Sequence, residues 1–214
     1  MVTAAIFDKT GTLTEEGLSV LGVCRGDETF CEPVESFKEL QTQGVCEADG
    51  LNVETALATT HDLHYYNGSL LGEPLEAAMF EWTGATLQED ETPLALNTTC
   101  NAALSADGRQ ARAKIVEANP VKDVRQKYAI VRKFDFVAGL RRMSVVIKRE
   151  QDPSTYIFVK GAAEAISALC RLNTFPPSYN EQLNRWTHGG YRVLALAGKR
   201  IEGLEWQQTQ SMKR

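Results

Sequence analysis

Three segments near the middle of the chain, residues 128–136, 143–148 and 155–160, concentrate β-branched and aromatic residues between short polar turns. Runs of this composition, bounded by residues such as Asp, Pro and Ser, are typical of strands. Because the connections between them are short, we expect the three strands to pair as an antiparallel meander.

Apolar residues at helical or strand-like spacing predict the other regular elements. We expect helices at residues 34–43, 51–61, 73–83, 162–171 and 178–188, and further strands at residues 2–7, 17–23 and 191–198. In the helix over 73–83, Pro74 lies in the first turn and Gly84 stands where a C-terminal cap is expected. Asn67-Gly68 between two apolar runs predicts a hairpin with a type I′ turn. Residues 85–122 are rich in turn formers, so we expect a loop-rich insertion there.

These elements predict an α+β fold, in which helices pack on the faces of a mainly antiparallel sheet. The 214 residues suffice for one domain with insertions. No window holds the roughly 20 consecutive apolar residues of a membrane-spanning helix, so we expect the chain as given to be soluble.

Side chains that often bind metals are scattered along the chain. The five cysteines form no CxxC pair, which argues against a zinc knuckle or a disulfide framework and fits a reducing, cytosolic compartment. His61 and His64 flank Asp62 without a second pair of ligands. We therefore expect these histidines to be satisfied surface or core residues rather than metal ligands.

Charge is unevenly distributed in this chain of net charge −5. Residues 109–142 carry ten Lys or Arg against three acidic residues. Such a stretch is usually a solvated face, and the alternatives are contact with a nucleotide or with an anionic lipid surface.

The most specific motif is Asp-Lys-Thr-Gly-Thr-Leu-Thr at residues 8–14. The preceding apolar run predicts a buried strand that holds Asp8 rigidly, and Gly11 lets the backbone turn closely around a phosphoryl group. Asp8 could therefore act as a nucleophile that forms an aspartyl-phosphate, while Lys9 neutralises charge on the transferring oxygens. Phosphatases of the haloacid dehalogenase type carry a second Asp where this chain has Thr10. Because Thr10 cannot serve as their general acid and base, an acyl-phosphate would persist.

This motif resembles the phosphorylation motif of the P-type ATPases. The resemblance implies that Asp8 is the phosphorylated catalytic residue, assisted by Lys9 and Thr10. It also implies that Asp8 and Thr10 contribute to a Mg²⁺ site in the full-length protein. ATP is the implied phosphoryl donor, and the implied partners are the remaining phosphorylation, actuator and membrane domains of the same polypeptide. No nucleic acid partner is expected, and we expect the isolated chain to be a monomer.

Two further strings resemble the nucleotide-binding domain of the same family. Gly-Glu-Pro-Leu-Glu at residues 72–76 resembles its short acidic motif, which implies that Glu76 contacts the adenine. Phe-Asp-Phe-Val-Ala-Gly-Leu-Arg-Arg-Met-Ser at residues 134–144 resembles the segment whose second aromatic ring stacks on the adenine. The resemblance places Phe136 in that role and Arg141 near the phosphates.

The remaining site residues come from two strings in the last third of the chain. Val-Lys-Gly-Ala-Ala-Glu, beginning at Val159, resembles the family's Lys-Gly-Ala-Pro-Glu and implies that Lys160 and Gly161 contact the nucleotide. An alanine replaces the usual proline, which should soften the following helical turn slightly. Residues 190–197 resemble the arginine-bearing strand of the same site and imply that Arg192 contacts phosphate.

Several strings resemble the type 5B subgroup, which is linked to polyamine transport across late endosomal, lysosomal or vacuolar membranes. The type 5A subgroup, implicated in removing misinserted helices from the endoplasmic reticulum, shares part of them. In the full-length protein we expect this chain on the cytosolic face of an endomembrane. Residues 1–20 are expected to be a fragment of the phosphorylation domain and residues 21–200 the nucleotide-binding domain. Residues 201–214 are expected to be a tail that leads back to the phosphorylation domain.

In this family a lysine motif and a Thr-Gly-Asp-Gly-x-Asn-Asp string, both later in the sequence, complete the magnesium site. The chain contains neither of these two motifs. We therefore expect ATP binding without turnover. Two alternatives stay open: a free phosphatase or phosphotransferase that uses Asp8, and a regulatory domain that has lost nucleotide binding.

Overall fold

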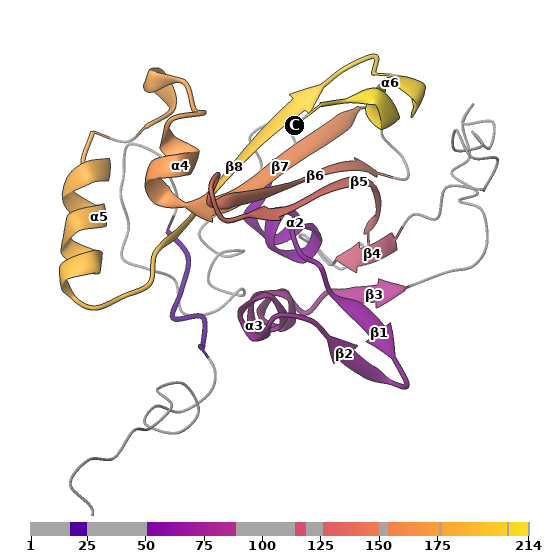
Figure 1. The fold of residues 1–214 in the computed structure, drawn as a ribbon, viewed down its shortest axis with the longest axis horizontal. Coiled ribbons are helices and arrows are strands. Elements are labelled where there is room, and N and C mark those ends of the chain that lie inside the picture. The colour runs from indigo at the N-terminus through magenta and orange to yellow at the C-terminus, as the bar shows by residue number, and fades with distance from the viewer. Residues whose placement is uncertain are drawn as a thin grey trace, which may run out of the picture.

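The computed structural model describes residues 18–24, 51–88, 114–118, 126–149, 154–175, 177–204 and 206–213. The elements expected at 2–7 and 34–43 lie outside the described residues, and so do Asp8, Lys9 and Thr10. The described part combines a six-stranded sheet, a separate two-stranded hairpin and several helices (Figure 1).

The six-stranded sheet is antiparallel throughout, in the order β3-β4-β5-β6-β7-β8. Its strands are β3 (Thr86–Gln88), β4 (Lys114–Ala118), β5 (Gln126–Val137), β6 (Arg142–Arg149), β7 (Thr155–Ala162) and β8 (Leu194–Ile201). The expected meander is confirmed as β5, β6 and β7, and the α+β fold with a mainly antiparallel sheet is confirmed with it.

Strands β3 and β4 lie within the segment that we expected to be loop-rich, residues 85–122, of which the structure describes 85–88 and 114–118. Leu87 pairs with Val116 across the two strands, and both residues are buried. Burial of this apolar pair in the main core explains why these short polar-flanked segments become strands. Their sequence signal is weak because each strand is only three or five residues long.

The helices begin and end largely where capping signals stand. They are α2 (Val53–Thr59), α3 (Pro74–Thr83), α4 (Ala163–Ser167), α5 (Tyr179–His188) and α6 (Trp206–Ser211), with a 3₁₀ turn over Leu172–Thr174. The Asn52 side chain caps α2 by accepting a hydrogen bond of 2.6 Å from the Thr55 amide. Gly84 ends α3 at φ 68°. No helix among the described residues is long and apolar enough to cross a bilayer.

Three expected boundaries are wrong. The helix expected at 162–171 ends at Ser167, and the chain continues as turns. Of the strand expected at 17–23, residues 18–22 have irregular backbone and Val23 forms an isolated bridge. Two apolar residues in it, Leu18 and Leu21, are exposed, so the segment is not a buried strand. The strand expected at 191–198 starts later, because β8 pairs with β7 only from Leu194 onward.

One face of the sheet carries the main core. Helices α2 and α3 contact each other, and α2 also contacts strands β4 and β8 (Figure 1). Val145 and Ile147 of β6 and Phe158 of β7 belong to this cluster. Val146, which points to the opposite face as strand alternation requires, belongs to a smaller cluster that includes Met212. The sheet therefore separates two apolar layers, and the larger one holds α2 and α3.

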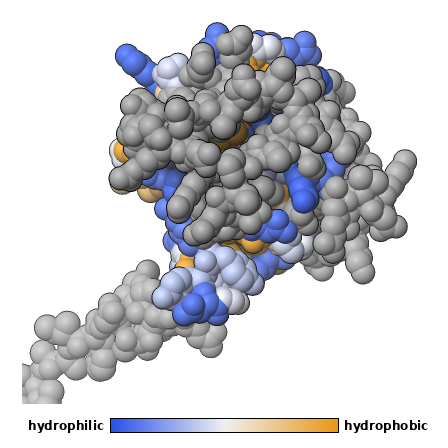
Figure 2. All heavy atoms as spheres, turned by 90° about the vertical axis from the view of Figure 1, so that its right-hand side faces the viewer, coloured by the Kyte–Doolittle hydropathy of each residue, from blue (hydrophilic) through white to orange (hydrophobic). Residues whose placement is uncertain are grey.

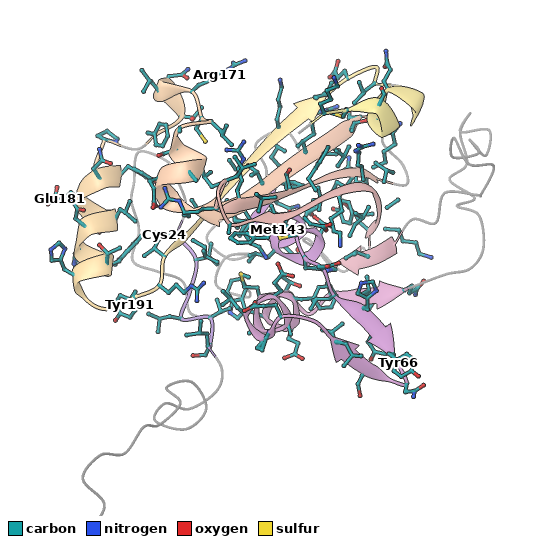
Figure 3. The ribbon with its side chains drawn as sticks, viewed as in Figure 1. Cys24, Tyr66, Met143, Arg171, Glu181 and Tyr191 are labelled. Atoms are coloured by element: carbon teal, nitrogen blue, oxygen red, sulfur yellow. The ribbon has the colours of Figure 1, made fainter. Side chains whose placement is uncertain are left out.

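The Asn67-Gly68 hairpin is confirmed as β1 (His64–Tyr66) and β2 (Ser69–Leu71). Asn67 has φ 49° and Gly68 has φ 80°, as a type I′ turn requires. The hairpin extends away from the main sheet, with Tyr66 near its tip (Figure 3). On the side that Figure 2 shows, the surface of the described residues is mostly hydrophilic to neutral, with only small hydrophobic areas.

The turn between β5 and β6 lies directly against the end of β7. The Ala162 amide donates a hydrogen bond of 3.0 Å to the Arg141 carbonyl oxygen. A Cβ atom at Gly161 would lie 2.3 Å from that oxygen. Glycine is therefore the residue that allows the two backbones to approach this closely.

Replacing Gly161 by Ala is expected to lower the free energy of unfolding by about 1–3 kcal/mol, because the backbone of the turn must move. Gly139→Ala is the matched control, since no atom lies within 4 Å of its added Cβ. That control should change stability by no more than about 0.5 kcal/mol. Urea denaturation of both variants measures the difference, and equal losses would contradict the close approach.

Candidate functional site

The antiparallel register gathers four of the sequence-predicted site residues at one end of the sheet. Phe136 lies near the end of β5, Arg141 lies in the following turn, and Lys160 and Gly161 lie near the end of β7. Strand β7 pairs Lys160 with Met143 on one side, the position labelled in Figure 3, and with Leu196 on the other. Phe136 and Lys160, 24 residues apart, therefore lie at the same end of the sheet, because β5 and β7 run in the same direction on either side of β6.

The centre of this region is an ion pair between Lys160 of β7 and Glu76 in the first turn of α3. Lys160 Nζ lies 3.2 Å from Glu76 Oε1. The two side chains are only 7% and 14% exposed, so both charges are largely removed from water. A lysine is rarely this buried unless it is paired, and Glu76 supplies the partner. The pair connects the sheet to α3.

Burial and pairing act on Lys160 in opposite directions. Burial disfavours the charged ammonium and lowers the pKa of Lys160 below its usual 10.5, while the carboxylate of Glu76 partly restores it. Glu73 adds a weaker electrostatic contribution of the same sign as Glu76. The carboxylates around Lys160 therefore favour its charged form and offset part of the effect of burial.

Glu76 is held from a second side by the backbone of the α2–β1 connection. The Asp62 amide donates a hydrogen bond of 2.7 Å to Glu76 Oε2. The Glu76 amide in turn donates to Glu73 Oε2 at 3.1 Å, so Glu73 acts as the N-cap of α3. Within the described part of the chain each Glu76 oxygen thus has one donor, and a carboxylate oxygen can accept a second hydrogen bond.

The connection that carries Asp62 is fixed by His61 and Lys133. The buried His61 ring accepts a hydrogen bond of 3.1 Å from the Leu63 amide at Nδ1 and donates one of 2.8 Å from Nε2 to Ala58 O. This arrangement requires a neutral imidazole with its proton on Nε2. His61 is therefore the satisfied core histidine that we expected.

Lys133 ties the same connection to β5. Its ammonium contacts the Asp62 carboxylate and lies 2.9 Å from Asp135 Oδ1. Burial by itself would lower the pKa of Lys133, but hydrogen bonds to the two carboxylates outweigh it and raise the pKa above 10.5. The Lys133 ammonium therefore holds Asp62 next to β5. Because the Asp62 amide binds Glu76, the same contact also helps to position Glu76.

Phe136 lies at an irregularity in the pairing of β5 with β6. Phe134 pairs with Ser144 and Val137 with Arg142, so β5 contains one extra residue between these pairs. A bulge of this kind re-aims side chains and is common beside functional sites. The Phe136 side chain is 60% exposed, as a stacking platform must be, although a phenylalanine ending a strand is more often core.

The two arginines expected near phosphate lie on different parts of the fold. Arg141 Nη1 contacts Glu164 Oε1 in the first turn of α4. Arg192 is exposed and lies in the irregular segment before β8, not on the strand. Arg192 therefore lies two residues before β8 rather than on the strand, and its contact with phosphate stays a prediction.

Sequence reasoning missed Asp62, Lys133 and Glu164 as parts of this region. In the sequence Asp62 stands out only as a neighbour of two histidines, and Lys133 only as part of a basic stretch. Lys133 and Asp62 are 71 positions apart, so no local pattern indicates their contact. Glu164 stands in the string beginning at Val159. Its acidic place in a first helical turn was a usable signal.

The arrangement suits a ligand with a flat aromatic part and anionic groups. An exposed ring at Phe136 offers stacking, and the paired Lys160 and Glu76 offer both a donor and an acceptor at the same end of the sheet. Among the residues that the structure describes, no group of three His, Cys, Asp or Glu could hold a metal ion. The residues expected near Mg²⁺, Asp8 and Thr10, lie outside that part.

The lowered pKa of Lys160 can be measured from the ¹³Cε shift of its side chain as pH rises. The midpoint is expected below 10.5. Glu76→Gln should lower it further, because the main carboxylate that favours the charged form is lost, and the control Glu73→Gln should lower it less. A midpoint at or above 10.5, or a larger effect of Glu73→Gln, would contradict the geometry.

The same titration has a consequence for stability. Between the lowered folded pKa of Lys160 and its unfolded value, the unfolded chain binds more protons. The stabilising contribution of Lys160 to the free energy of unfolding is therefore fully present above its unfolded pKa of 10.5. It is lost as the pH falls through the lower pKa of the folded state. Comparing the free energy of unfolding of the unmodified chain with that of Lys160→Met across this window isolates the effect.

Comparison with known proteins identifies the family. Residues 37–175 match the family model described as P-type ATPase, cytoplasmic domain N. The chain is 34% identical, over 97% of its length, to the vacuolar cation-transporting ATPase YPK9 of Saccharomyces cerevisiae. It has the same identity and coverage with the polyamine-transporting ATPase 13A3 of Homo sapiens. It is 30% identical, over 92% of its length, to the probable cation-transporting ATPase 13A5 of Mus musculus.

The chain spans 16%, 17% and 15% of the lengths of these three relatives. The family model covers both Glu76 and Lys160, which form the buried ion pair, and the exposed Phe136 between them in the sequence. The chain therefore belongs to the P-type ATPase family and contains its cytoplasmic domain N.

Proposed function

We propose that this chain is the ATP-binding part of a P-type ATPase that transports a cation or polyamine across an endomembrane. The observation that carries the ATP-binding proposal is the exposed Phe136 ring on the same sheet end as the buried Lys160–Glu76 pair. The names of the relatives, a vacuolar cation-transporting ATPase and a polyamine-transporting ATPase, support the transport part.

In this proposal the adenine binds between Phe136 and the ion pair. Phe136 supplies a stacking face, which is worth about 1–3 kcal/mol per base. The free lone pair on a Glu76 oxygen accepts a hydrogen bond from the adenine amino group. Lys160 keeps further N–H donors for a ring nitrogen or for phosphate, and Gly161 leaves room for close approach.

The phosphate groups would extend toward the arginines. Arg141, at the turn beside Gly161, and Arg192, before β8, are the exposed cations expected at that end. In the full-length protein an Asp8 carboxylate oxygen would attack the γ-phosphorus of ATP with the help of Lys9 and Thr10, so that an aspartyl-phosphate forms as the bond to the β–γ bridging oxygen breaks and ADP leaves. Bound Mg²⁺ would neutralise charge on the transferring group there.

The complete transporter would also use the remaining phosphorylation, actuator and membrane domains. Phosphorylation of Asp8 would drive the movement of solute through the membrane part, with this chain on the cytosolic face. The similarity to both vacuolar and polyamine-transporting relatives favours the type 5B subgroup over type 5A.

Titration of the purified chain with ATP, followed by amide chemical shifts, tests the binding site. Saturable shifts near Phe136, Lys160 and Glu76 are expected with a dissociation constant of about 1 mM, equivalent to about −4 kcal/mol. Phe136→Ala should weaken binding by about 1–3 kcal/mol without loss of stability, because the ring is exposed. Leu172→Ala, which removes a side chain of a residue that is 91% exposed, is the matched control and should bind ATP normally.

No shifts up to about 10 mM ATP, ten times the expected constant, would refute ATP binding and favour a regulatory domain. Equal weakening by Phe136→Ala and Leu172→Ala would show that the stacking site is elsewhere.

The isolated chain is expected to release no phosphate from ATP or from a chromogenic phosphate ester, with or without Mg²⁺. Thr10 cannot replace the acid and base of a phosphatase, and the chain contains no Thr-Gly-Asp-Gly string. A continuous phosphate-release assay checks this, with Asp8→Asn as the control. Release that disappears in Asp8→Asn would support the phosphatase alternative instead.

A further inference from the structure

The backbone of Arg141 is fixed at several points. Its amide donates hydrogen bonds to Val137 O at 2.8 Å and to Ala138 O at 3.3 Å, and its carbonyl accepts from the Ala162 amide. Its φ of 48° is left-handed, a conformation that an arginine adopts only when its surroundings hold it there. The turn thus determines where the arginine side chain starts.

The side chain of Arg141, by contrast, is weakly held. Among the described residues its guanidinium has one anionic partner, Glu164, through a single Nη1 contact with Oε1. The side chains of the pair are 56% and 59% exposed. Exposed ion pairs with one hydrogen bond are easily exchanged, because water screens the attraction and neither side chain is packed in place.

We propose that Glu164 is an internal anion that pairs with Arg141 when no nucleotide is bound and releases it to the phosphate groups of a bound nucleotide. Glu164 is then a positioning residue that controls how tightly this end of the site holds phosphate. The inference rests on the proposed ATP-binding function and concerns its phosphate end alone.

The chemistry of the two anions favours this exchange. A guanidinium has five N–H donors in a planar fork that matches two oxygens of a phosphate, whereas Glu164 uses only Nη1 in this structure. A nucleoside triphosphate also carries several negative charges, whereas the Glu164 carboxylate carries one. Phosphate therefore displaces Glu164, and the displaced carboxylate stays near the phosphates because α4 follows β7 directly.

The exchange has a cost that only phosphorylated ligands meet. Phosphate must break the Arg141–Glu164 contact and accept a neighbouring negative charge, and adenosine does neither. Glu164 therefore lowers the affinity for ATP while leaving the affinity for adenosine unchanged. Glu164 thus reduces the difference in affinity between ATP and adenosine.

The test compares binding of adenosine and of ATP to the full 214-residue chain by amide shifts at low salt. Glu164→Gln is expected to raise ATP affinity by about two- to fivefold, in line with the strength of exposed ion pairs, and to leave adenosine affinity unchanged. In an Arg141→Gln background the same change should no longer raise ATP affinity. Thermal unfolding confirms that each variant is folded.

Glu181→Gln is the matched charge control. Glu181 is exposed on helix α5. In Figure 3 it lies away from Met143, the residue of β6 that pairs with Lys160. Its removal lowers the net negative charge by the same amount and should change ATP affinity less than Glu164→Gln.

Three results would overturn the inference. The first is an ATP affinity that falls or stays the same in Glu164→Gln. The second is an equal rise for adenosine, and the third is an equal rise when Arg141 is absent, which would show general repulsion rather than exchange. If the unmodified chain binds neither ligand, the proposed function itself fails and this inference fails with it.

Discussion

The arrangement of the candidate site depends on the buried contact between the Lys160 ammonium and the Glu76 carboxylate. Removing either partner would leave a charge in a poorly solvated place, which is far more costly than the modest net gain from forming the pair. The contact also fixes geometry, because Lys160 belongs to the sheet and Glu76 to α3. Asp62, whose amide holds the other Glu76 oxygen and whose carboxylate meets Lys133, extends the same network to β5.

The sheet supplies the rigid frame around this network. Five antiparallel strand pairings bring the C-terminal ends of β5 and β7 to the same end of the sheet, where the residues expected to bind the nucleotide lie. The apolar clusters on both faces keep the strands in register, because a slip by one residue would exchange the two faces. Gly161 lets the β5–β6 turn close over the end of β7, so Arg141 starts from a defined position beside Lys160.

Different parts of the site are held with different strength. Lys160 and Glu76 are buried and connected to the core, whereas Phe136 and Arg141 are exposed. A site of this kind can recognise the base through fixed groups and the phosphates through groups that rearrange. The contact of Arg141 with Glu164 is the clearest example, since its backbone is fixed and its side chain is free to change partner.

Features that depend on short-range chemistry could be predicted from the amino-acid sequence alone. Asn67-Gly68 predicted the hairpin through its positive φ values, Pro74 and Gly84 predicted the limits of α3, and β-rich runs predicted the meander. The resemblance of short strings to the P-type ATPases also predicted six residues of a nucleotide site. The family itself is confirmed, whereas the individual roles of the six residues stay predictions.

Features that depend on long-range contacts could be recognised only in the folded chain. The β5 bulge beside Phe136 arises from pairing with β6, and strands β3 and β4 arise from the burial of Leu87 against Val116. The pairings of Lys133 with Asp62 and of Arg141 with Glu164 join positions 71 and 23 residues apart. Local sequence patterns report on neighbours within a few residues, so partners brought together by sheet register are visible only once the chain has folded.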